Sequence, residues 1–278
     1  MDTVRHPDEK GMPFAKGHGT GNDFVVIPDP NGELVLGPMT VAALCDRRRG
    51  IGGDGLLRVV RTAAEPEVAS LGGEADWFMD YRNADGSLAE MCGNGVRVYA
   101  RYLVDAGLAA PGPVRILTRS GVVVADVGEG SVSVEMPLPQ VYGQSTAHLA
   151  GHAFEGTVAT CGNPNLVCFV DDPAALDLGS PPALDAQTLP SGANVEFVRE
   201  VAPLSVSLRV VERGVGETMS CGSGACATAA VVLRRGGLDE GTVTVEVPGG
   251  TLLVAIDAEH CVLTGPAVIV ATGELRRS

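Results

Sequence analysis

The chain has 278 residues, and its 20 lysines and arginines against 34 aspartates and glutamates give a formal net charge of −14. This length allows one large or two ordinary domains, each able to bury a core. An acidic chain without a basic stripe is poorly suited to phosphate backbones or anionic lipid surfaces, so we expect no nucleic-acid partner and no membrane partner.

The lengths of the apolar runs and the spacing of the cysteines indicate in which cellular compartment the protein resides. No uninterrupted apolar run approaches the roughly 18 residues of a spanning helix. The polar segment 1–13 lacks the apolar centre of a signal peptide, and we interpret it as a disordered N-terminal extension. The seven cysteines are odd in number and widely spread, unlike those of a secreted disulfide scaffold. We therefore expect reduced thiols and a cytoplasmic protein.

Short strands dominate the predicted elements, in the order that follows. The first half predicts strand–turn–strand over 14–27, a short helix at 41–49, and strands at 56–60, 77–82, 114–118, 121–127 and 132–136. The second half predicts strands at 158–160, 166–170 and 204–210, a long surface connection over 171–190, and strands at 243–247, 252–256, 261–264 and 268–271. Segment 50–55 fits G-x-G-x-x-G, but a helix precedes it and a strand follows, so we reject a dinucleotide site.

Two helices are predicted to begin with the same motif, Cys-Gly-Xaa-Gly. The first follows residues 92–95 and has an apolar stripe that stops at Gly107, and the second follows residues 221–224 and ends near 234–237. A Gly-Asn turn precedes each motif. The chain therefore reads as a duplication with an α+β fold, in which each half wraps strands around one buried helix.

The thiols of Cys92 and Cys221 are the candidate catalytic groups. A thiol at a helix N-terminus lies among free backbone N–H groups, which favour negative charge. If the halves are related by a pseudo-twofold axis, the two thiols face each other across one cleft. This geometry suits removal of a proton from one face of a carbon and its replacement on the other. We interpret the remaining cysteines as packing residues: Cys45, Cys161, Cys168, Cys226 and Cys261.

Polar residues for holding a ligand also recur in predicted turns. Asparagine both donates and accepts, so a set of asparagines can hold a zwitterionic amino acid. The candidates are Asn22, Asn83, Asn94, Asn163 and Asn194, together with the charged groups of Glu212 and Arg213. We expect no metal, because Cys221 and Cys226 lack a second ligand pair at zinc spacing. We expect no pyridoxal cofactor, because the only lysines, Lys10 and Lys16, lack a supporting motif.

From residue 14 to the C-terminus the sequence resembles the diaminopimelate epimerases, which are cofactor-independent amino-acid epimerases. The motifs that carry the resemblance are Gly21-Asn22-Asp23-Phe24, residues 81–87, residues 91–97, Gly162-Asn163-Pro164, residues 194–197, residues 212–218 and residues 221–224. The resemblance implies two pseudo-symmetric domains, each a barrel-like, mainly antiparallel sheet around a central helix. We assign residues 14–131 and the returning strand 263–278 to the first domain, and residues 132–262 to the second.

The resemblance also implies conversion of LL-2,6-diaminopimelate to the meso form, for lysine and peptidoglycan synthesis, by a homodimer. Cys92 as thiolate and Cys221 as thiol would exchange roles with the direction of reaction. The substrate contacts implied are Asn22, Asn83, Asn163, Asn194, Glu212 and Arg213, with the backbone amides of Gly93, Asn94, Gly222 and Ser223 receiving the α-carboxylate.

The chain departs from the family pattern at two positions. Asn165 stands where the pattern has a histidine, and Gly55 stands where a glutamine is common. An asparagine cannot exchange a proton near neutral pH. Two alternatives therefore stay open: a related racemase or epimerase of another amino acid, and an amino-acid-binding or thiol-switch protein without catalysis.

Overall fold

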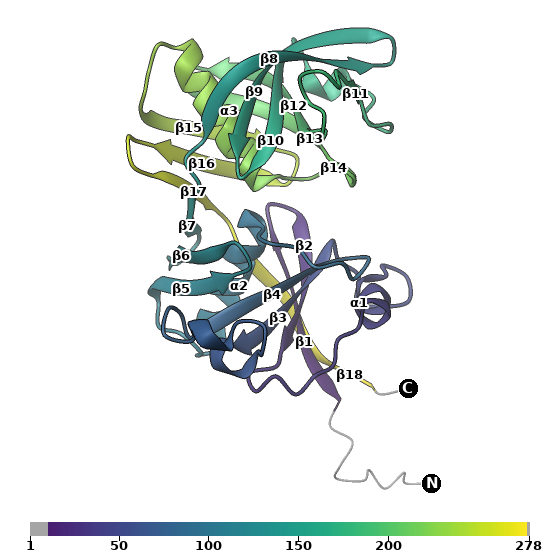
Figure 1. The fold of residues 1–278 in the computed structure, drawn as a ribbon, viewed down its shortest axis with the longest axis vertical. Coiled ribbons are helices and arrows are strands. Elements are labelled where there is room, and N and C mark those ends of the chain that lie inside the picture. Colours follow the sequence, from purple (N-terminus) through teal and green to yellow (C-terminus); the bar gives the residue numbers. More distant parts are fainter. Residues whose placement is uncertain (1–10, 277–278) are drawn as a thin grey trace, which may run out of the picture.

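The computed structural model describes residues 11–276, which form two lobes stacked along the long axis of the molecule (Figure 1). The first lobe contains β1 (Met12–Gly19), β2 (Asn22–Pro28), α1 (Pro38–Cys45), β3 (Gly55–Arg61), β4 (Trp77–Asn83), α2 (Gly93–Asp105), β5 (Gly112–Thr118), β6 (Gly121–Val127) and β18 (Val268–Leu275). The second contains β8 (Gln140–Leu149), β9 (His152–Cys161), β10 (Asn163–Phe169), β11 (Ala183–Leu184), β12 (Asn194–Ala202), β13 (Ser205–Glu212), β14 (Gly216–Thr218), α3 (Gly222–Arg235), β15 (Gly241–Val247) and β16 (Gly250–Ile256). Strands β7 (Val132–Met136) and β17 (Cys261–Gly265) join the lobes, and the 3-10 turns are η1 (Thr62–Ala64), η2 (Ala69–Leu71) and η3 (Pro173–Ala175).

Each lobe wraps strands around one helix, α2 in the first and α3 in the second (Figure 1). The inward positions of α2 are apolar, and the side chains of Val96, Tyr99 and Leu103 are fully buried. Helix α3 has small buried residues at the same helical spacing, including Ala225 and Ala229, so strands can approach it closely. The expected α+β fold, with one buried helix in each half, is confirmed.

Strands β7 and β17 carry the sheet from one lobe to the other. They pair antiparallel, from Cys261 opposite Met136 to Gly265 opposite Val132. β7 also pairs with β6 of the first lobe, and β17 pairs with β16 of the second. After β17 the chain returns to the first lobe, where β18 pairs with β1. The sheet is continuous across this region, so the strand pairing gives no break that marks a domain limit. The limits at residues 132 and 263 therefore stay a prediction.

Several boundaries differ from those expected. Residues 1–10 of the predicted disordered extension lie outside the described residues, and β1 begins at Met12, inside the segment we expected to be disordered. Helix α1 begins at Pro38 and ends at Cys45, four residues short of the predicted end, because Asp46 is extended. The connection after β10 is confirmed as mostly irregular, with only η3 and the two-residue β11.

Of the long hairpin formed by β8 and β9, the sequence predicts only residues 158–160, which lie at the end of β9. Its turn is made by Ala150 and Gly151, both with positive φ, and lacks the Asn-Gly or Asp-Gly pair that marks such turns. Strand β12 was also missed because it begins with Asn194 and carries charged residues at its exposed end. Within residues 11–276, no helix is long and apolar enough to cross a membrane.

We predict that Leu103→Ala will destabilise the protein by about 2–5 kcal/mol, because it leaves a cavity beside α2 where the side chain is fully buried. The measurement is urea unfolding of the variant and the parent protein. The matched control is Leu238→Ala, whose side chain is 43% exposed and which should cost no more than about 0.5 kcal/mol. Equal losses in the two variants would contradict the packing role of α2.

Candidate active site

The two candidate cysteines occupy equivalent places at the beginnings of α2 and α3. Cys92 is the N-cap of α2, with φ −144° and ψ 118°, and its sulfur accepts a hydrogen bond from the Gly95 N–H at 3.4 Å. Cys221 is the N-cap of α3, with φ −125° and ψ 119°. The predicted placement of both thiols at helix N-termini is therefore confirmed.

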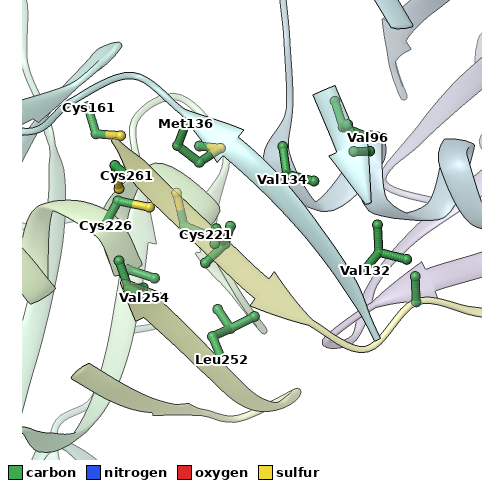
Figure 2. Close-up of a cluster of buried hydrophobic side chains, with 14 of the residues drawn as sticks. Val96, Val132, Val134, Met136, Cys161, Cys221, Cys226, Leu252, Val254 and Cys261 are labelled. Carbon is green, nitrogen blue, oxygen red and sulfur yellow. The ribbon is translucent and has the colours of Figure 1, made fainter. Parts of the chain in front are cut away.

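The first turns of the two helices contact each other through glycine. A Cβ added to Gly222 would lie 3.6 Å from the Gly93 Cα and 3.1 Å from a methyl of Leu263 on β17. A Cβ added to Gly93 would lie 3.1 Å from the sulfur of Met136 on β7. Figure 2 shows Met136 and Cys221 beside β17 at this junction. The lack of side chains lets the two N-termini, and hence the two thiols, converge on one region between the lobes.

Hydrogen bonds between the lobes fix this convergence. The Asn94 Nδ2 group donates across the lobes to the backbone oxygen of Ser220 at 3.0 Å, and within the first lobe to Asn22 Oδ1 at 3.3 Å. Thr20 Oγ1 donates to Ser220 Oγ at 2.7 Å. Since Ser220 immediately precedes Cys221, residues of the first lobe hold the chain that carries the second thiol.

The environment of Cys92 is partly polar. Its thiol donates to Asn22 Oδ1, with a sulfur–oxygen distance of 3.6 Å. Burial raises the pKa of Cys92 to about 11, and the negative charge of Glu212 acts in the same direction. The N–H groups of Gly95 and Asn94 and the cation of Arg97 oppose this rise. Burial thus favours the thiol form of Cys92, while these three groups favour its thiolate.

Cys221 is more deeply enclosed, with 8% of its surface exposed. Its sulfur lies 3.4 Å from Ser223 Oγ and 3.8 Å from Asn194 Nδ2. Burial raises its pKa well above the ordinary value, and the acidic groups of Glu212 and Glu196 add to the rise. This second thiol is therefore the stronger candidate for a proton donor.

Glu212 and Arg213 point to different partners. The Thr218 hydroxyl donates to Glu212 Oε1 at 2.5 Å. Burial raises the pKa of Glu212, while hydrogen bonds from Thr218 and Cys221 oppose the rise. The Arg213 guanidinium donates to the Ser191 carbonyl at 2.8 Å, and its backbone N–H donates to Asn194 Oδ1 at 3.0 Å. Glu212 therefore belongs to the surroundings of Cys221, and Arg213 lies at the exposed rim.

The asparagines divide into a central group and a marginal group. Asn22, Asn94 and Asn194 are buried and contact the cysteines or the residues beside them. Asn83 ends β4 and donates to Ser87 Oγ at 3.0 Å, and Asn163 is exposed at the start of β10. Four of the five stand at strand ends, but Asn94 lies in the first turn of α2, so its prediction as a turn residue was wrong.

The other five cysteines are all buried free thiols, as the packing interpretation predicted. Cys161, Cys226 and Cys261 gather in one cluster behind Cys221, formed by β9, α3 and β17 (Figure 2). In the described part of the chain, no group of three or more His, Cys, Asp or Glu side chains is arranged to hold a metal ion.

Comparisons with known proteins agree with this arrangement. The family model for diaminopimelate epimerase matches residues 14–141 and 157–270. The chain belongs to the diaminopimelate epimerase family. Diaminopimelate epimerase of Thermobifida fusca is 52% identical over 96% of this chain and 99% of its own length, and that of Streptomyces coelicolor is 51% identical over 94% of each. The resemblance seen in the motifs is confirmed, and the chain is an isomerase.

Solved structures of more distant proteins share the fold. A PhzF-family phenazine biosynthesis protein from Bacillus anthracis has a TM-score of 0.68 at 17% identity, covering 96% of this chain and 100% of its own. A hydroxyproline epimerase from Agrobacterium vitis has a TM-score of 0.65 at 15% identity, covering 96% and 91%. At such identities the likeness concerns the fold alone.

The two departures from the family pattern are accommodated by local contacts. Asn165 is fully buried, donates to the Asn163 carbonyl at 2.7 Å and accepts from Asn194 Nδ2 at 3.1 Å. It therefore orients the amide that reaches Cys221 but carries no exchangeable proton. At Gly55, a Cβ would lie 2.7 Å from the Arg82 backbone oxygen and 2.8 Å from the ring of Tyr81, so β4 leaves no space there for a longer side chain.

Two residues that the sequence did not single out are Asp54 and Glu196. The Asp54 carboxylate accepts from Asn22 Nδ2 at 2.7 Å. Glu196, on β12, is fully buried, and both of its carboxyl oxygens lack a hydrogen-bond partner within the described structure. It faces the first turn of α3, where a Cβ at Gly224 would collide with it. A run of apolar strand residues interrupted by one glutamate was the available signal for Glu196.

Glu196 gives a pH-dependent prediction for this family member. Burial raises the pKa of Glu196 well above its usual 4.5, with Glu212 adding to the rise. Glu196 has its usual pKa of about 4.5 in the unfolded chain and a higher pKa in the folded protein. Between these values the unfolded chain releases a proton that the folded protein keeps, so the free energy of unfolding falls as the pH rises above about 4.5. We expect Glu196→Gln, which cannot ionise, to gain about 1–4 kcal/mol relative to the parent between pH 5 and pH 8.

The measurement is denaturant unfolding of parent and variant at both pH values. At each pH we take the free energy of unfolding of the variant minus that of the parent, and the prediction concerns how this difference changes from pH 5 to pH 8. The difference at a single pH is not informative, because a buried amide also alters stability by itself. Glu200→Gln, an exposed position on the same strand, is the matched control and should show no such change. A difference for Glu196→Gln that is constant with pH would show that Glu196 is not held protonated.

Proposed function

We propose that this chain epimerises LL-2,6-diaminopimelate to meso-diaminopimelate, using Cys92 and Cys221 as the two bases and no cofactor. The observation that carries the proposal is the pair of thiols at the N-caps of α2 and α3, whose first turns touch through Gly93 and Gly222. One thiolate takes the α-proton from one face of the carbon. The other thiol gives its proton to the opposite face, which inverts the centre and exchanges the protonation states of the two sulfurs.

The backbone groups of the two first turns suit the charge that develops in this reaction. Removing the α-proton places negative charge on the α-carbon and the adjoining carboxylate. The N–H groups of Gly93, Asn94, Gly222 and Ser223 lie at two helix N-termini, where they favour an anion and need little rearrangement. We assign the α-carboxylate to this position, between the thiols.

Burial raises the pKa of both thiols, so forming the reactive thiolate on substrate binding requires the release of one proton. The ammonium group of the substrate brings positive charge beside the cysteines, which lowers the pKa of a thiol. The proton that leaves passes to solvent. Cys92 already has three groups that favour its thiolate, so we assign it as the base in the LL to meso direction.

The side chains around the sulfurs suit a zwitterionic ligand. Asn22 and Asn194 lie beside the two cysteines, and Glu212 offers a carboxylate to an ammonium. We assign the distal end of the substrate to the rim, where Asn83, Asn163 and Arg213 lie. We also propose that the protein is a homodimer that acts in lysine and peptidoglycan synthesis. We place it in the cytoplasm, because its seven free thiols are those expected of a reducing compartment.

We predict that the purified, reduced protein will exchange the α-proton of LL-diaminopimelate with deuterium and form the meso isomer without added cofactor or metal. Proton NMR in deuterated buffer measures both events. Cys92→Ser and Cys221→Ser should each lower epimerisation at least about 100-fold, because each removes one of two required proton carriers. Cys168→Ser, at a buried thiol outside this group, is the control and should retain turnover.

Other outcomes distinguish the alternatives. Exchange with a different amino acid and little with diaminopimelate would favour a related racemase, for which the substitution of Asn165 is the supporting observation. Binding of an amino acid with no exchange, unaffected by either cysteine change, would overturn the catalytic proposal in favour of a binding protein.

A further inference from the structure

The side chain of Asn22 bridges an ion-pair cluster and the Cys92 thiol. On one side, its Nδ2 group donates to Asp54 Oδ2 at 2.7 Å. On the other, its Oδ1 atom accepts from the Cys92 thiol at 3.6 Å and from Asn94 Nδ2 at 3.3 Å. An amide has one end that donates and one that accepts. The contacts with Asp54 and Asn94 both require the oxygen to face the sulfur, and the one with the Asp54 carboxylate is the shorter.

Asp54 fixes that contact because an ionised carboxylate can only accept hydrogen bonds. Its own position is set by two further donors. Arg47 Nη2 donates to Asp54 Oδ1 at 2.8 Å, and the Asp23 backbone N–H donates to Asp54 Oδ2 at 3.2 Å. The amide nitrogen of Asn22 must point to Asp54, and the amide oxygen must point to Cys92.

We propose that Asp54 is a positioning residue of the reaction: it holds the oxygen of Asn22, rather than its NH₂ group, against the Cys92 thiol. This inference rests on the proposed function of Cys92. The oxygen keeps Cys92 as a hydrogen-bond donor until substrate binds, and it leaves an acceptor beside the sulfur for the ammonium of the incoming amino acid. With the amide reversed, the NH₂ group would stabilise the thiolate and repel the ammonium.

The other charged and titratable groups around Cys92 come from several elements. Glu212 acts on it from β13, Arg97 from α2, and Tyr81 from β4. None of these three touches the Asn22 amide through a side-chain hydrogen bond in residues 11–276. The orientation of the amide is thus set separately from the other influences on the thiol.

Asp23 provides a matched control for the charge of Asp54. Asp23 belongs to the same cluster, since Arg47 Nη2 also donates to Asp23 Oδ1 at 2.7 Å and Lys16 pairs with its other oxygen at 2.5 Å. Asp23→Asn and Asp54→Asn therefore remove the same charge from the same cluster. Only Asp54→Asn changes the partner of the Asn22 side chain.

The direction of the effect follows from the hydrogen-bonding groups. In Asp54→Asn one acceptor remains for donors on both sides, Arg47 on the Oδ1 side and Asn22 with the Asp23 N–H on the Oδ2 side, so the hold on the Asn22 amide is lost. Asn22 can then reverse, giving up the hydrogen bond from Asn94 Nδ2 and turning its NH₂ group to the Cys92 sulfur. We expect alkylation of Cys92 at pH 7.5 to rise about 3–10-fold, which corresponds to an apparent pKa lower by about half to one unit. Epimerisation should fall at least about 10-fold.

The experiment measures iodoacetamide labelling of the Cys92 peptide by mass spectrometry across pH 6–10, in the parent protein and in both variants. Labelling does not require turnover, so a protein that failed to epimerise diaminopimelate would still test the positioning role. Asp23→Asn should change the labelling of Cys92 less than about twofold. Equal labelling in the two variants, or an increased pKa in Asp54→Asn, would overturn the inference.

Asn22→Leu alone tests the inference without relying on how well Asp54→Asn folds. Asn22→Leu keeps the branched shape of the side chain but removes the oxygen, so Cys92 should again be labelled faster than in the parent. In the Asn22→Leu background, Asp54→Asn and Asp23→Asn should become equivalent, because the contact that distinguishes them is gone. Unchanged labelling of Cys92 in Asn22→Leu would overturn the inference by itself.

Discussion

The contact between Gly93 and Gly222 is the constraint on which the rest of the structure depends. Two helix N-termini carry partial positive charge and repel each other, so their approach requires compensation by an anion or by hydrogen bonds. Here Asn94 and Thr20 bridge to Ser220, and the sheet passes between the lobes through β7 and β17. The same arrangement that brings the thiols together thus creates a position that favours a bound carboxylate.

The burial of ionisable groups determines which protonation states are favoured in this site. Cys221, Glu212 and Glu196 lie in one enclosed region, and each has a raised pKa because an anion there is poorly solvated. A region that tolerates little negative charge keeps Cys221 as an acid. On the other side, Arg97 is a fully buried cation whose Nη1 group has no hydrogen-bond partner in the described structure, and it favours the thiolate of Cys92. The two similar cysteines thereby lie in different charge environments, with two carboxyl groups acting on Cys221 and both a carboxyl group and a cation acting on Cys92.

The elements that carry the chemistry could be predicted from the sequence, because their signals are local. Cys-Gly-Xaa-Gly before an apolar stripe placed both thiols at helix N-caps, since the glycines mark the turn and the stripe marks the helix that follows it. The hairpin of β8 and β9 could not be predicted, since its turn uses Ala150-Gly151 and its stability comes from neighbouring strands. The burial of Glu196 and the contact of Asp54 with Asn22 depend on strands and loops that meet only in the folded chain.

The substitution of Asn165 is best understood through the contacts that it keeps. Its oxygen accepts from Asn194, whose own oxygen accepts from the Arg213 N–H and whose NH₂ group reaches Cys221. An amide at position 165 thus orders Asn194 on the Cys221 side, as Asp54 orders Asn22 on the Cys92 side. Each thiol is flanked by an asparagine held in one orientation by a polar neighbour. Since neither asparagine can exchange a proton near neutral pH, the proposed reaction leaves proton transfer to the two sulfurs, and the amides provide orientation alone.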